Sequence, residues 1–307
     1  WSSDVCSSDL IWIIWPVRLG RVTIDFVEGD RTTMRVLKRL AAVMAAMLPS
    51  GAALAGLGQP SPWQLGLQQS GTEIMERITS FHDLLLTIIT VITLFVLVLL
   101  VLVIVRFNAW TNPVPSKTTH NTLLEVAWTL VPVMILVAIA VPSFKLLFFQ
   151  TVLPPGDITV KAIGKQWYWS YNYPDSKFEF DSLMLQDKDR KPDQPRLLAV
   201  DNEMVVPVNK VIRVQVIGSD VIHAFAVPSF GVKIDAIPGR LNETWFKATK
   251  EGMYYGQCSE LCGKDHAYMP IAVRVVSDKD YAAWIDAAKK KYASTDTPRA
   301  TTLAAAE

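Results

Sequence analysis

The sequence predicts two transmembrane α-helices, arranged as a hairpin, followed by an all-β extracytoplasmic domain. Two uncharged stretches long enough to cross a bilayer, residues 84–105 and 126–144, lie in the first half of the chain. After Gln150 the pattern changes to short β-rich runs, and 20 acidic and 20 basic residues follow. The mean hydropathy of +0.25 fits this division, being high for a soluble protein and low for a many-span transporter.

Charge and cysteine content exclude several classes of protein. The chain has 30 basic and 29 acidic residues and a formal net charge of +1. This balance argues against a nucleic-acid binder with a basic surface and against an acidic disordered chain. Three cysteines are too few for a disulfide-rich scaffold.

Residues 34–55 have the three parts of a secretory signal peptide in the right order. A basic segment follows Met34, an apolar core covers residues 40–48, and a small-x-small cleavage site ends at Ala55. We therefore expect Met34 to be the true start and residues 1–33 to be upstream or non-native sequence. The alternative is a short amphipathic helix, and N-terminal sequencing would distinguish the two.

The two spans form a membrane anchor within residues 56–150. The first span ends at Arg106 and the second at Lys145. The loop between them, residues 106–125, carries two basic residues and one acid, so the positive-inside rule places it in the cytoplasm. The mature N-terminus and the outer domain then lie outside, as a cleaved export signal also predicts.

Glu125 lies at the cytoplasmic start of the second span. A carboxylate there is favoured by the helix dipole and can simply be solvated. The second interpretation is a proton-uptake residue that serves a partner subunit.

The outer domain covers residues 151–292, and its runs predict a β-sandwich or barrel. The expected strands are residues 157–163, 166–173, 178–185, 211–217, 221–227, 242–248 and 269–276. Residues 279–292 predict a short amphipathic helix, and residues 293–307 a flexible tail.

The segment 254–270 carries four residues at the spacing of metal ligands. Cys258, Cys262, His266 and Met269 follow one another at intervals of four, four and three, and His223 lies 35 residues before Cys258 at one end of a predicted strand. Thiolate, imidazole and thioether groups are soft ligands that select copper over magnesium or calcium.

Three other interpretations compete with copper. The cysteines could form a disulfide, the Cys2His2 set could hold structural zinc, and Met269 could simply fill the core. The combination of all these ligand types favours copper. A mononuclear site needs one cysteine, whereas two bridging thiolates with one histidine per metal would make a dinuclear core. Such a core shares one electron between two metals, so its bonds change little on reduction, which suits an electron relay.

These segments resemble cytochrome c oxidase subunit II, in particular the bacterial aa3-type enzymes. The resemblance covers about residues 56–292 and is carried by segments 166–171, 220–223, 236–240 and 254–270, together with the two spans. It implies a cupredoxin-like outer domain with a dinuclear copper A centre. That centre would accept electrons from cytochrome c and pass them to the haem-containing subunit I, which reduces O2 to water coupled to proton translocation.

The resemblance also implies ligand roles. Cys258 and Cys262 would bridge the coppers, and His223 and His266 would bind one copper each. Met269 and the backbone carbonyl of Glu260 would be weak ligands. The Glu260 carboxylate would help to hold magnesium at the interface with subunit I, since hard oxygen ligands suit that ion.

Further residues are assigned by the same resemblance. Trp167 would be the first electron acceptor, although packing is the simpler role for an aromatic residue, as we expect for Trp169. Glu125 would lie at the mouth of a proton channel. Asp175, Asp220 and Asp235 are the candidate acids for docking lysine-rich cytochrome c. Asn172 stands where the family often has an acid.

The implied partners are subunit I and the other oxidase subunits, cytochrome c and membrane lipid, with the copper domain on the periplasmic side of the bacterial inner membrane. A quinol oxidase subunit II would lack the copper ligands that this chain has. A membrane-anchored copper carrier would not need a tryptophan-rich segment or Glu260, and two spans argue against a nitrous oxide reductase. The chain has four histidines and no Cys-x-x-Cys-His haem attachment motif, so O2 reduction would take place in a partner.

Overall fold

The computed structural model describes residues 58–292. The expected upstream segment 1–33, the signal peptide 34–55 and the tail 293–307 lie outside the described residues.

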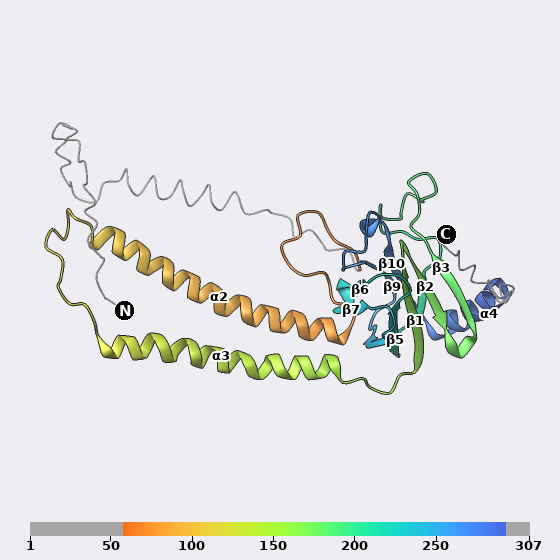
Figure 1. The fold of residues 1–307 in the computed structure, drawn as a ribbon, viewed down its shortest axis with the longest axis horizontal. Coiled ribbons are helices and arrows are strands. Elements are labelled where there is room, and N and C mark those ends of the chain that lie inside the picture. The colour runs from red at the N-terminus through yellow and green to blue at the C-terminus, as the bar shows by residue number, and fades with distance from the viewer. Residues whose placement is uncertain (1–57, 293–307) are drawn as a thin grey trace, which may run out of the picture. The chain divides into compact units, whose positions relative to one another are not determined.

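Both expected spans are helices, and each helix is longer than its apolar stretch (Figure 1). Helix α2 covers Glu73–Arg106 and α3 covers Thr122–Thr151, and both are long and apolar enough to cross a membrane. The Thr72 and Asn121 side chains cap them by accepting hydrogen bonds from main-chain N–H groups in the first turn. Two prolines lie inside α3 without ending it.

The outer domain is built from three β-sheets and one peripheral helix, α4 (Asp278–Tyr292). The five-stranded sheet has the order β3-β2-β1-β5-β8, the three-stranded sheet β4-β10-β9, and the two-stranded sheet β6-β7. The strands are β1 (Ile158–Lys165), β2 (Tyr168–Tyr173), β3 (Phe178–Ser182), β4 (Met204–Pro207), β5 (Val211–Gly218), β6 (His223–Val227), β7 (Val232–Ala236), β8 (Asn242–Lys247), β9 (Gly252–Gln257) and β10 (Pro270–Val276).

The seven expected strands are present, with ends shifted by up to three residues, and three further strands had not been predicted. Strand β4 is buried at every position, so it has no alternation to recognise. Strand β7 carries Lys233 and Asp235 on its exposed face, and β9 contains two glycines. Strands β4 and β9 therefore lack the alternation that reveals a half-buried strand, whereas β7 alternates over only five residues.

The core lies between the sheets and is rich in aromatic residues. Alternate residues of β1 and β5 are buried, and Trp169, Phe225, Phe246 and Tyr254 are fully enclosed. Trp284 of α4 packs against Tyr173, with ring centroids 5.2 Å apart. The expectation of an all-β domain followed by a short helix is therefore confirmed.

The start of α2 is attached to the outer domain by main-chain and side-chain hydrogen bonds. The Thr72 hydroxyl donates to the carbonyl of Phe230 (2.7 Å), and the Gly71 N–H donates to the carbonyl of Ser229 (2.8 Å). The Thr249 N–H donates back to the Gly71 carbonyl (2.9 Å). No free linker therefore separates this end of α2 from the β-strands.

Candidate metal centre

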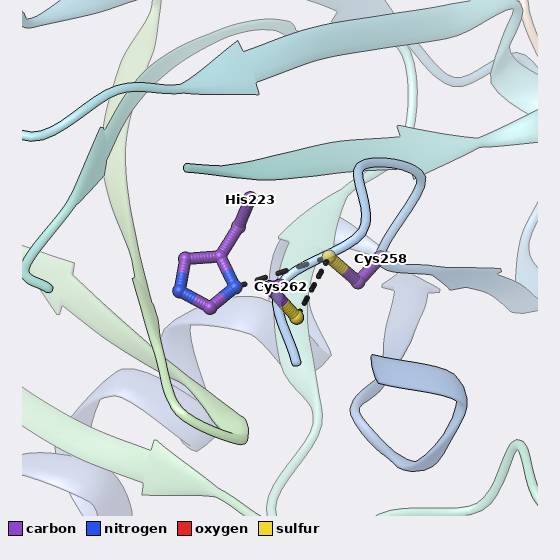
Figure 2. A group of neighbouring side chains, drawn as sticks. All are labelled: His223, Cys258 and Cys262. Carbon is purple, nitrogen blue, oxygen red and sulfur yellow. Dashed lines mark hydrogen bonds between the residues drawn. The ribbon is translucent and has the colours of Figure 1, made fainter. Parts of the chain in front are cut away.

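Two strand ends and the loop between them bring the expected metal ligands together. Strands β9 and β10 are antiparallel, with Gln257 opposite Pro270. Cys258 therefore leaves β9 beside the point where Met269 enters β10, and the loop between them carries Cys262 and His266. His223 is the first residue of β6, and its ring nitrogen Nδ1 faces Cys258 (Figure 2). Cys258, Cys262, His266 and Met269, at intervals of four, four and three residues, thus all lie in the single loop that joins β9 to β10.

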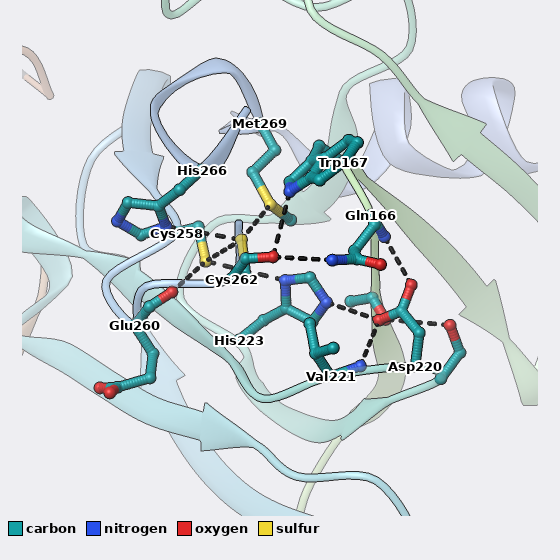
Figure 3. A network of polar contacts seen from close by, with 12 residues as sticks. Gln166, Trp167, Asp220, Val221, His223, Cys258, Glu260, Cys262, His266 and Met269 are labelled. Carbon is teal, nitrogen blue, oxygen red and sulfur yellow. Dashed lines mark hydrogen bonds and ion pairs between the residues drawn. The ribbon is translucent and has the colours of Figure 1, made fainter. Parts of the chain in front are cut away.

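Of the six expected donors, four surround the other two, which are the cysteine sulfurs (Figure 3). The sulfurs of Cys258 and Cys262 are 3.9 Å apart. Around them lie His223 Nδ1 and the Glu260 carbonyl oxygen, 3.9 and 3.3 Å from Cys258 Sγ, and His266 Nδ1 and Met269 Sδ, both 3.5 Å from Cys262 Sγ. The arrangement offers two shared sulfurs with an imidazole beside each.

The two cysteines are free in this structure. Their separation of 3.9 Å is about twice the ~2.05 Å of a disulfide bond. Both thiols are buried, and His223 and Met269 are almost fully enclosed. These four groups are therefore shielded from water, which strengthens the electrostatic interactions among them, whereas His266 is only half-buried.

The electrostatics of the thiol pair suit a bound cation. Burial is the largest single effect on Cys258 and opposes its ionisation, but hydrogen bonds with His223, His266 and the main chain together outweigh it and lower the pKa of that thiol. Burial and the negative charge of Cys258 raise the pKa of Cys262. The second thiolate is thus unfavourable unless positive charge lies between the sulfurs, and a soft metal ion supplies that charge while deprotonating both. The donor set fits copper, and Met269 sulfur is a ligand for which zinc has little use.

Asp220 orients the imidazole of His223. Its Oδ1 lies 2.8 Å from His223 Nε2, and it also accepts hydrogen bonds from the main-chain N–H groups of Val221 (2.6 Å) and Gln166 (2.7 Å). An ionised carboxylate only accepts, so Nε2 carries a hydrogen, and Nδ1 is the ring nitrogen that faces Cys258. Despite burial, these hydrogen bonds lower the pKa of Asp220, so it is ionised at neutral pH.

Trp167 is linked to the sulfur loop by one hydrogen bond. Its indole N–H donates to the Cys262 carbonyl (3.2 Å), and the Gln166 side-chain amide donates to the same oxygen (2.9 Å). Trp169 differs, because it is fully buried, donates to the Met269 carbonyl (3.3 Å) and packs edge-on against His223. This is the packing role expected for it.

Two residues that support the site received no role from the sequence. Gln166 lay inside a recognised motif, yet its links join it to Asp220, 54 residues later, and to Cys262, 96 residues later. Gly164 lies so close to His223 that a Cβ there would be 2.8 Å from His223 Cδ2. A glycine within an otherwise regular strand was the signal for such a close approach.

The remaining expected residues lie away from the sulfurs. Glu125 is half-buried in the first turn of α3. Asp175 is exposed beyond the end of β2, the end opposite to Trp167, whereas Asp235 on β7 is next to Ala236, which pairs with His223. The Glu260 carboxylate points away from the sulfurs that its carbonyl faces (Figure 3).

Comparison with known proteins supports the same family in both parts of the chain. Residues 60–146 match the family model of the cytochrome c oxidase subunit II transmembrane domain, and residues 158–276 match that of its periplasmic domain. The periplasmic domain of subunit II of cytochrome oxidase from Bradyrhizobium japonicum is 75% identical, with a TM-score of 0.44, over 46% of this chain and 99% of that one.

Relatives that match most of the chain indicate the same family. A probable cytochrome c oxidase subunit 2 of Rickettsia bellii is 52% identical over 237 residues, which cover 77% of this chain and 88% of the relative. The cytochrome c oxidase subunit 2 of Cereibacter sphaeroides is 46% identical over 251 residues, covering 76% and 83%. The chain therefore belongs to the cytochrome c oxidase subunit II family, and is a membrane-anchored subunit of a haem–copper oxidase.

Proposed function

We propose that this chain accepts electrons from cytochrome c at a copper A centre and passes them to the haem-containing subunit I. The observation that carries the proposal is the pair of buried, unlinked sulfurs 3.9 Å apart, each with an imidazole nitrogen nearby. When bound, two coppers would supply a one-electron relay. Cys258 and Cys262 would bridge them, His223 and His266 would bind one each, and Met269 Sδ and the Glu260 carbonyl would complete the set.

Trp167 is the proposed first acceptor of the electron. It is partly exposed, and its indole N–H reaches the main chain of a bridging cysteine directly. Asp175, Asp220 and Asp235 remain the candidate acids for docking. Asp235 has the strongest geometric support among them, because it is exposed and adjacent to the strand pair that carries His223.

Two further roles belong to the partner interface. The exposed Glu260 carboxylate would help to hold magnesium against subunit I, while its carbonyl serves the copper pair. Glu125, at the start of α3, would take up protons from the cytoplasm. Both roles place the outer domain in the periplasm and the loop between α2 and α3 on the cytoplasmic side of the inner membrane, as the basic residues of that loop favour.

The test of electron acceptance is Trp167→Ala in the assembled oxidase. We expect oxidation of cytochrome c to slow by at least about tenfold, which is roughly 1.4 kcal/mol of barrier, while copper content and the copper A absorption stay unchanged. Trp167→Phe keeps an aromatic ring in place and controls for packing. A normal rate of cytochrome c oxidation in both variants would refute the assignment.

The proton role is tested separately with Glu125→Gln. Because only proton uptake is removed, steady-state turnover should fall while the first electron still reaches the copper centre at the wild-type rate. Stopped-flow and turnover measurements on the same preparation separate the two. Unchanged turnover would show that Glu125 is merely a solvated residue at the end of the helix.

A further inference from the structure

A cavity lies at the C-terminal end of α2 and has no part in the proposed electron relay. It has a volume of about 640 Å³, within the range of about 300–1,000 Å³ that ligand sites occupy. Its lining changes from apolar residues of the helix to polar residues of the loop that follows, and consists of Leu102, Val105, Arg106, Phe107, Thr111 and Asn112. A ligand that fills it therefore needs both an apolar part and a polar part.

The loop beside this cavity is an ordered turn. The side-chain amide of Asn108 donates to two carbonyls in the last turn of α2, at 3.1 and 2.9 Å, and its oxygen accepts from the main-chain N–H groups of Trp110 and Thr111, both at 3.0 Å. The Thr111 hydroxyl donates to the Arg106 carbonyl (3.0 Å). Because these bonds satisfy the last carbonyls of the helix, the shape of the cavity does not depend on a ligand.

Two hydrogen-bond donors at the cavity are available to a group from outside the chain. Within residues 58–292, neither the Arg106 guanidinium nor the Asn112 side-chain amide forms a hydrogen bond or an ion pair. Residues 107–124 contain no Asp or Glu, and Lys117 adds a second positive charge. The surroundings therefore favour an anion, and a phosphate group matches the planar fork of a guanidinium.

The cavity lies where the hydrocarbon of a bilayer would end. The uncharged stretch of α2, residues 84–105, amounts to about 33 Å of helix, and the hydrocarbon core of a bilayer is about 30 Å thick. Arg106 follows directly, so its charge is at the level of the lipid phosphates. Trp110, in the same loop, is 94% exposed, and an exposed tryptophan is typical of a membrane–water interface.

We propose that this cavity binds the phosphate of an anionic phospholipid, which Arg106 and Asn112 hold. Leu102 and Val105, both exposed in the last turns of α2, would contact the first carbons of the acyl chains. A zwitterionic lipid fits less well, because its ammonium group finds no carboxylate in residues 107–124. The inference requires only that α2 crosses the membrane, and it does not rest on the proposed electron transfer.

The experiment uses the assembled oxidase in nanodiscs of phosphatidylcholine with increasing fractions of a photoactivatable phosphatidylglycerol. Mass spectrometry maps the cross-links, and their yield in residues 102–112 gives the half-saturating fraction of the probe. Arg106→Gln should raise this fraction about fivefold, the usual effect of one basic residue at an anionic membrane surface. Arg106→Lys keeps the charge and should raise it less. Asn112→Leu should raise it about two- to tenfold, the effect of one lost hydrogen bond.

The matched control is Lys145→Gln, which removes the same charge from α3 and should leave the yield in residues 102–112 at the wild-type value. Unchanged haem and copper contents show that each variant is assembled. Equal yields from a photoactivatable phosphatidylcholine would overturn the inference, because the contact would then be ordinary contact with the bilayer. So would a yield that Arg106→Gln leaves unchanged, or cross-links on α2 that spare residues 102–112. Displacement of the probe by inorganic phosphate, beyond that by sodium chloride of equal ionic strength, would indicate a site for free phosphate and not for lipid.

Discussion

Asp220 has one role that the sequence motif suggested and a second that the structure shows. The sequence motif suggested an acid for cytochrome docking, whereas the structure has both of its oxygens hydrogen-bonded within the protein, one of them to His223. A residue can be recognised from a motif, but its partners depend on which other segment approaches it. Here that segment includes Gln166, 54 residues earlier in the chain.

We predict that Asp220→Asn weakens copper binding by about 10- to 100-fold, the usual effect of removing the carboxylate partner of a metal-bound histidine. An amide has only one acceptor oxygen, so it cannot serve His223 Nε2 and the Gln166 N–H together. Competition with a copper(I) chelator measures the change. Asp235→Asn, which removes a nearby exposed acid, is the control and should bind copper normally.

Gly164 is the second residue at which the site can be tested. In Gly164→Ala the new methyl group would lie 2.8 Å from the His223 ring, so the imidazole has to shift. We expect altered copper A absorption and electron-spin hyperfine splitting in a folded protein. Gly66→Ala is the control, because nothing lies within 4 Å of a Cβ there. An unperturbed spectrum in Gly164→Ala would mean that the strand, and not the imidazole, absorbs the clash.

At the scale of the element, the helices could be predicted from sequence more fully than the strands. The length of residues 84–105 and 126–144 and their lack of charge were enough to predict both helices. The extensions of α2 and α3 beyond these stretches were not predicted, because charged residues such as Glu73, Asp83 and Lys145 interrupt the apolar run there. Strands β4 and β9 escaped prediction because one is buried at every position and the other contains two glycines, and β7 was missed although its residues alternate.

Thr72 connects α2 to the outer domain, so its side chain should contribute to the stability of the protein. Its hydroxyl caps α2 by accepting from the Met75 N–H (3.1 Å) and also donates to the Phe230 carbonyl. We predict that Thr72→Ala destabilises the protein by about 1–3 kcal/mol, from the lost cap and the unpaired buried carbonyl. Thr72→Ser keeps the hydroxyl and should lose less than half as much. Thermal unfolding of the purified chain in detergent compares the two; equal losses would show that the methyl group, not the hydroxyl, is important.

At the scale of the whole molecule, the proposed metal ligands could be recognised from the sequence because most of them occupy one loop. Cys258, Cys262, His266 and Met269 are neighbours in sequence, and only His223 had to be added from elsewhere. The position of Lys264 over Trp167 could not be predicted in this way. It depends on the approach of two segments about a hundred residues apart, and no periodicity in either segment encodes that approach.

The junction between α2 and the outer domain leads to one more prediction. Eleven residues of α2, Glu73 to Asp83, precede the uncharged stretch and amount to about 16 Å of helix. Inserting four alanines after Asp83 would lengthen this part by about 6 Å and rotate it by about 40° beyond a full turn. We expect normal copper absorption but strongly slowed transfer to the haem of subunit I, measured by flash photolysis. Wild-type transfer would mean that contacts with subunit I override the helix.

Because hydrogen bonds of Gly71 and Thr72 join α2 directly to the β-strands, the outer domain holds the start of this helix without a flexible linker between them. The first turn of α2 and the main chain at Phe230 and Thr249 would then move together, so that a displacement of one displaces the other.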